Sequence, residues 1–191
     1  MTASASPARP STRMAVDLAK PLPLTDAAKA LLTPALTPRQ FFDTLAAQPP
    51  LAEDAIRFLA VALPKREAVW WALLCVRSAL PKPPPEATKA ISAAEGWVKQ
   101  QTDASRRSCG EAAELAGHGT AAGCLADAAF WSGGSLAPPH LPAVAPSDEL
   151  TGAGVSAAVL LAAVIDPDNA PANRAKFVVL GSEVASGKSR W

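Results

Sequence analysis

The stretch PKREAVWWALLCVRSAL, residues 64–80, decides the fold that this sequence predicts. Residues 68–76 are all apolar, so a helix over them leaves no face for water. The run is too short to cross a bilayer, which needs about 20 apolar residues. We therefore expect a buried central helix that starts at Pro64 and ends before Pro81.

Aromatic side chains in and beyond this helix define the expected core. Trp70 and Trp71 are adjacent and project about 100° apart on a helix, so two different neighbours must cover them. The predicted structural core consists of Trp70, Trp71, Leu74, Trp97 and Phe130. A stacking surface for a ligand is the alternative interpretation, and the core is favoured because aromatic runs of this kind are mostly buried.

Composition narrows the class of protein. The chain has 191 residues and a net charge of +1, which suits one domain with a tail and gives no reason to expect a nucleic-acid partner. Tyrosine is absent and alanine is abundant, which favours close-packed helices over strands. No secretory signal, membrane-length apolar run or disulfide pattern is present, so we expect a cytoplasmic protein without membrane contact.

Hydrophobic periodicity and proline stops predict an all-α fold, a single compact bundle or irregular array of about eight helices. The expected helices cover residues 38–47, 51–63, 64–80, 86–102, 103–117, 121–131, 149–165 and 170–185. Residues 1–30 are expected to be a flexible arm, 31–187 the helical domain and 188–191 a tail. Residues 154–165 form the other strongly apolar run, and we expect them to pack against 64–80.

A long Pro/Gly/Ser segment, SGGSLAPPHLPAVAPS, occupies residues 132–147. Loops of this length are uncommon in compact domains and are often functional. We predict an interaction loop that includes Trp131, Ser132, Gly133, Gly134, Ser135 and His140. Residues 133–135 could also form an amide nest for an anion, but we favour the plainer interpretation that the two glycines let the chain leave the preceding helix in a left-handed turn.

Motifs that could carry chemistry are weak. The tail GSEVASGKS resembles a phosphate-binding loop, but it has one intervening residue too many and no helix follows it. The spacing of Cys109, His118 and Cys124 matches no familiar zinc pattern, so no metal or cofactor is predicted. A catalytic Cys–His pair stays an open alternative, since such partners need only meet in space.

Two segments, LPKREAVWWALLCVRSAL (63–80) and AAFWSGGSLAPPHLPAVAPSDELTGAGVSAAVLLAA (128–163), resemble a bacterial all-helical family catalogued only as a domain of unknown function. The motifs KREAVWW and FWSGGSLAPP carry the resemblance, which would extend from residue 37 to the end of the chain. It implies a bacterial, cytoplasmic protein with an accessory or adaptor role in a multiprotein system. It brings no catalytic residues with it.

We therefore expect a non-enzymatic interaction module whose protein partner the sequence does not identify. One alternative is a small-ligand protein or enzyme that uses the 131–135 turn together with Arg66 and Glu67. Another is a structural subunit of an oligomer, which would carry a large exposed apolar patch. The sequence alone does not fix the oligomeric state.

Overall fold

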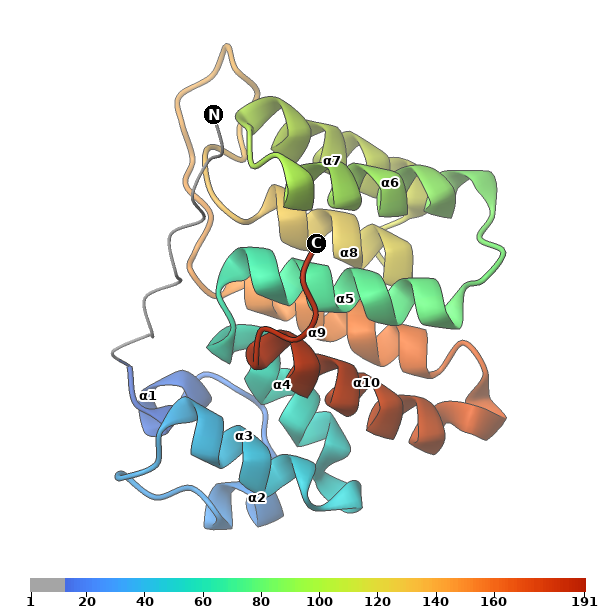
Figure 1. The fold of residues 1–191 in the computed structure, drawn as a ribbon. Coiled ribbons are helices and arrows are strands. Elements are labelled where there is room, and N and C mark those ends of the chain that lie inside the picture. The colour runs from blue at the N-terminus through green and yellow to red at the C-terminus, as the bar shows by residue number, and fades with distance from the viewer. Residues whose placement is uncertain (1–12) are drawn as a thin grey trace.

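The computed structural model describes residues 13–191, and this part of the chain is entirely helical, with ten α-helices, two short 3-10 helices and no strand (Figure 1). The helices are α1 (Ala15–Ala19), α2 (Asp26–Ala30), α3 (Pro38–Ala46), η1 (Pro49–Leu51), α4 (Ala52–Ala62), α5 (Lys65–Ala79), α6 (Pro85–Lys99), α7 (Asp103–Ala116), α8 (Ala121–Phe130), α9 (Leu150–Ala163), η2 (Pro167–Asn169) and α10 (Ala170–Ala185). The predicted all-α class is confirmed, and the eight expected helices correspond to α3–α10.

Threonine caps fix where several helices begin. The Thr37 hydroxyl accepts a hydrogen bond from the backbone N–H of Gln40, and the Gln40 side chain accepts one from the backbone N–H of Thr37. Pro38 occupies the first helical position, where its missing N–H costs nothing. The hydroxyls of Thr102 and Thr120 likewise accept hydrogen bonds from the backbone N–H groups of Ser105 and Gly123 and so cap α7 and α8. These starts follow from local sequence.

The centre of the bundle is shared between α5 and α8. The expected contact between α5 and α9 is present, and α5 also packs against α6, α8 and α10. α8 is the more enclosed helix, because every residue from Ala121 to Ala129 is buried. Among the expected core residues, Trp71 and Trp97 are buried, while Trp70, Leu74 and Phe130 are half-buried and pack against the core.

Small residues let the central helices approach closely. A Cβ added to Gly154 of α9 would lie 3.0 Å from Ala128 of α8. A Cβ added to Gly181 of α10 would lie 2.3 Å from the Leu59 side chain and 3.0 Å from the Trp71 ring. Glycine is therefore the residue that fits at these two crossings.

The expected flexible arm is wrong for residues 15–30, which form α1 and α2. Leu18 and Leu24 are buried, and Thr25 donates two hydrogen bonds to the Asp54 carboxylate of α4, at 2.9 Å from its backbone N–H and 2.8 Å from its hydroxyl. Each helix is only five residues long, too short to show a periodic pattern, and tertiary contacts hold it in place. The first part of the predicted arm, residues 1–12, lies outside the described residues.

The chain end also folds back onto the bundle. The expected tail, residues 188–191, returns over the start of α5, where the Arg66 guanidinium lies 4.1 Å from the centre of the Trp191 ring. Within residues 13–191 no single helix has both the length and the apolarity that a membrane crossing requires. α9 and Pro167–Ala185 meet those two criteria only when joined, and they are bent by 107° at the break.

Candidate interaction site

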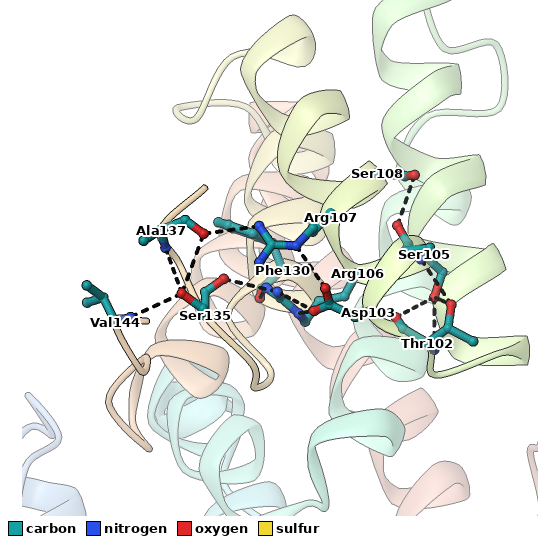
Figure 2. Close-up of polar contacts among 11 residues, drawn as sticks. Thr102, Asp103, Ser105, Arg106, Arg107, Ser108, Phe130, Ser135, Ala137 and Val144 are labelled. Carbon is teal, nitrogen blue, oxygen red and sulfur yellow. Dashed lines mark hydrogen bonds and ion pairs between the residues drawn. The ribbon is translucent and has the colours of Figure 1, made fainter. Parts of the chain in front are cut away.

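The 132–147 loop is tied to the bundle through Arg106 of α7 (Figure 2). The Arg106 side chain is almost fully buried, with 3% of the residue exposed. Its Nη1 donates to the carbonyl of Phe130 at 2.9 Å, and its Nη2 donates to the carbonyl of Ser135 at 3.0 Å. One guanidinium therefore joins the end of α8 to the first turn of the loop.

Asp103, in the first turn of α7, orients this guanidinium and its neighbour. Its Oδ1 accepts from Arg106 Nε at 3.0 Å and Nη2 at 2.6 Å, and its Oδ2 accepts from Arg107 Nε at 2.8 Å. Arg107 then donates from Nη1 to the carbonyl of Ala137 at 3.1 Å. Hydrogen bonds from Arg106 and then Arg107 lower the pKa of Asp103, so the carboxylate stays charged at neutral pH.

Ser135 connects the two limbs of the loop. Its hydroxyl accepts from the backbone N–H of Ala137 at 3.1 Å and of Val144 at 3.0 Å. The backbone N–H of Leu136 donates to the carbonyl of Val144 at 2.8 Å. These bonds close the base of the loop as a narrow neck between residues 135–137 and 144.

The tip beyond this neck faces solvent. A hydrogen bond from the Leu141 N–H to the Pro138 carbonyl, 3.0 Å long, closes a tight turn that contains His140. His140 is exposed, and Leu141 and Val144 are 51% and 53% exposed. Residues 132–147 contain no Asp, Glu, Lys or Arg. The tip therefore presents mainly apolar surface around His140, and Val144 adds an exposed apolar side chain beside the neck.

The Trp131–Ser135 turn is held by two further side chains. Lys65, the first residue of α5, donates from Nζ to the carbonyl of Ser132 at 3.1 Å. Thr151 of α9 donates from its hydroxyl to the carbonyl of Trp131 at 3.1 Å. Gly134 has φ of +63°, a conformation that favours glycine, so its role in turning the chain is structural.

A pocket of about 380 Å³ lies beside this turn. It is lined by Lys65, Trp97, Gln101, Thr102, Asp103, Arg106, Ser132, Gly133 and Gly134. Arg66 and Glu67, which the sequence pointed to, are not among the lining residues. Arg66 instead donates to the carbonyls of Val98 and Lys99 at the end of α6, at 2.6 and 3.3 Å. The basic residues at this end of the bundle thus satisfy carbonyls that helix ends leave without partners.

Cys124 and His118 do meet in space, but around Asp127. His118 Nδ1 lies 2.8 Å from Asp127 Oδ2, and the Cys124 thiol donates to the backbone carbonyl of His118 at 3.0 Å. Burial and the Asp127 charge raise the pKa of the Cys124 thiol, which disfavours the thiolate that a nucleophile requires. Cys109 is buried in α7, where desolvation raises its pKa to about 12. Within residues 13–191 no three His, Cys, Asp or Glu residues cluster in a way that could hold a metal ion.

The structure does not support a phosphate-binding loop in the tail segment GSEVASGKS. Phe177 and Leu180, which would have ended a strand before the loop, lie in the middle of α10. A phosphate-binding loop needs a strand before it and a helix after it. The segment has no strand before it.

Residues 41–185 match the model of a family of unknown function, DUF6931. The chain belongs to the DUF6931 family. The match confirms the expected membership in a family of unknown function, and the matched region holds both sequence motifs and the whole tethered loop. No curated protein and no solved structure matches the chain.

Sequence reasoning missed the hydrogen bonds by which Arg106 holds the 132–147 loop of this DUF6931 protein, although one signal pointed to them. Arg106 shares one side of α7 with Cys109 and Ala113, which are buried. A basic residue on an otherwise apolar stripe indicates a buried partner. The partner carbonyls of Phe130 and Ser135 lie 24 and 29 residues away, so local pattern could not name them.

Proposed function

We propose that this protein is a non-enzymatic interaction module that recognises a protein partner through the tip of the 132–147 loop. The observation that carries the proposal is the contrast within the loop. Its base is fixed by Arg106, Arg107 and Ser135, whereas the side chains of Leu141 at the tip and of Val144 beside the neck are exposed. Apolar side chains exposed on an ordered surface loop suit a site that a partner covers.

Pre-organisation supports the proposal energetically. A flexible loop loses conformational entropy when it binds, and this loss lowers its affinity. Here the hydrogen bonds at the neck already restrict the loop before a partner binds. Because residues 132–147 carry no Asp, Glu, Lys or Arg, the matching surface on the partner is apolar and binding changes little with salt concentration.

The chemistry near the loop also favours binding over catalysis. The charged groups that line the neighbouring pocket, Lys65, Asp103 and Arg106, already make hydrogen bonds that hold the fold. Burial raises the pKa of Cys75, Cys109 and Cys124, so their thiols are poorly suited to nucleophilic attack.

The proposal places the module in the cytoplasm of a bacterium, as an accessory or adaptor component of a multiprotein system. The resemblance of the KREAVWW and FWSGGSLAPP segments supports this setting. The three cysteines are free and buried, in keeping with a reducing compartment.

The test is quantitative affinity capture with the full chain as bait, comparing wild type with the double variant Leu141→Ser/Val144→Ser. Val179→Ser is the matched control, because Val179 lies on α10 and is 58% exposed. A partner of the loop is recovered equally by wild type and the control at low and high salt. The double variant binds this partner more weakly, and its affinity falls about tenfold for each 1.4 kcal/mol of binding free energy that the two side chains contribute. Equal recovery by the double variant, with its helical content unchanged, contradicts the proposal.

A second candidate function is small-ligand binding in the 380 Å³ pocket, favoured by the observation that Lys65 and the Ser132–Gly134 turn line it together. Isothermal titration with inorganic phosphate and with short carboxylates tests this function. A ligand of the pocket binds wild type and fails to bind Lys65→Met. Absence of measurable heat for every ligand counts against it.

A further inference from the structure

A second surface lies at the opposite end of the bundle from the loop. Here α5, α7 and α9 end and α6 and α8 begin, on the right in Figure 1. A groove of about 560 Å³ opens between them. Its walls are mainly apolar and include Leu80, Ala87, Leu115, Leu161, Val164 and Ile165. The loop and the 380 Å³ pocket share no residue with this groove.

The groove is accompanied by an apolar projection. Leu115, near the end of α7, is 60% exposed, and Val164 and Ile165, directly after α9, are exposed as well. The same face therefore carries both a knob, Leu115, and a hollow between α6, α8 and α9. This combination suits a two-fold contact between identical chains, in which each copy offers what the other receives.

Charges around the groove have both signs. Along the chain, Lys82 follows Leu80 of the groove wall by two residues, and Lys89 follows Glu86, a carboxylate of that wall, by one helical turn. Glu114 and Asp166 are the sequence neighbours of Leu115 and Ile165. All four are exposed, and within residues 13–191 none of them takes part in a salt bridge. A rim with unpaired charges of both signs is complementary to itself when the lysines of one copy face the carboxylates of the other.

We propose that this face is the interface of a homodimer, in which Leu115 of each copy enters the groove of the other across a two-fold axis. The net charge of +1 sets up little repulsion between two copies. A partner of another sequence would need its own set of charges complementary to those around the groove, whereas a second copy of this chain supplies them by symmetry. The dimer leaves the two 132–147 loops free at its far ends, so it presents two copies of the same loop to a partner assembly.

Sedimentation equilibrium of the full chain over a range of concentrations tests the dimer. Wild type fits a monomer–dimer equilibrium, and Leu115→Lys raises the dimer dissociation constant at least about tenfold, because it brings a charge into an apolar groove. Val179→Lys is the control, since this equally exposed residue lies on α10, away from the groove. It leaves the dissociation constant unchanged.

Charge reversal separates the proposed geometry from simple loss of folding. Lys82→Glu/Lys89→Glu and Glu114→Lys/Asp166→Lys are each expected to weaken self-association about tenfold or more, because like charges then face each other. Mixed in equal amounts, the two variants form a heterodimer of wild-type strength, since every facing pair is again opposite in sign.

Three outcomes overturn the proposal. Wild type that stays monomeric at every concentration shows that no second copy fills the groove. Association that Leu115→Lys and Val179→Lys weaken equally belongs to another surface. A mixture of the two charge variants that stays monomeric, while each variant keeps its helical circular dichroism, excludes the paired rim.

Discussion

The guanidinium of Arg106 donates a hydrogen bond to the carbonyl of Ser135, 3.0 Å away in space and 29 residues along the chain. The same group reaches Phe130, so a single buried side chain secures both ends of the Trp131–Ser135 turn. The proposed recognition loop thus depends on α7, a helix with few large apolar residues.

Arg106→Met is expected to lower the free energy of unfolding by about 1–3 kcal/mol, because it leaves the part-buried carbonyls of Phe130 and Ser135 without this donor. Hydrogen exchange should also quicken at the amides of Ala137 and Val144, which are held at the neck. Arg107→Met is the matched control. Its side chain is more exposed, so its loss costs at most about 1 kcal/mol. Equal effects of the two variants would contradict the role of Arg106.

Gly181→Ala should destabilise the protein by about 1–3 kcal/mol. The added Cβ would lie 2.3 Å from the Leu59 side chain and force α10 away from α4 and α5. Gly96→Ala, in an exposed part of α6 where nothing lies within 4 Å, should instead stabilise by up to about 1 kcal/mol through helix propensity. Chemical denaturation measures both. The same sign for both changes would show that the α10 crossing is looser than described.

Trp71→Phe should cost about 1 kcal/mol more than Trp70→Phe. Trp71 Nε1 donates to the carbonyl of Phe177 at 2.9 Å, whereas the buried Nε1 of Trp70 has no partner anywhere in residues 13–191. Urea unfolding followed by circular dichroism compares the two variants on an equal footing. A larger loss for Trp70→Phe would mean that this indole has an unseen partner.

The His118–Asp127 pair should make stability depend on pH. The hydrogen bond that the imidazole donates to the Asp127 carboxylate, together with the charge of that carboxylate, raises the pKa of His118 in the folded chain. The protonated imidazole therefore contributes stability that is fully present below its unfolded pKa, about 6.5, and is lost as pH rises through the higher folded pKa. Burial raises the pKa of Asp127, so the contribution is also lost in acid, where that carboxylate becomes protonated.

Melting temperatures of wild type and His118→Ala, measured from mildly acidic to mildly alkaline pH, check this prediction. The advantage of wild type should shrink as the pH rises. Asp127→Asn should remove this pH-dependent difference, because no carboxylate is then left to favour the imidazolium. A wild-type advantage that is constant with pH would contradict the assignment.

Local sequence was sufficient for the helices. Thr37 with Pro38, Thr102 and Thr120 mark starts through side-chain caps that act within three residues. The apolar runs 68–76 and 154–165 have no polar face for solvent, so the sequence predicts that they pack against each other. The contact between α5 and α9 confirms this prediction. The same reasoning failed for α1 and α2, whose five-residue lengths give no period to read.

By itself, the sequence determined the eight helices α3–α10, where most of them start and stop, and that residues 132–147 form a long loop, because periodicity, caps and prolines act over a few residues. Only the tertiary structure decided that Arg106 is buried under that loop, that Lys65 rather than Arg66 meets the Trp131–Ser135 turn, and that Leu115 stands beside an apolar groove. Each of these facts depends on partners 24 to 67 residues away or on a surface formed by five helix ends, and no local pattern specifies such distances.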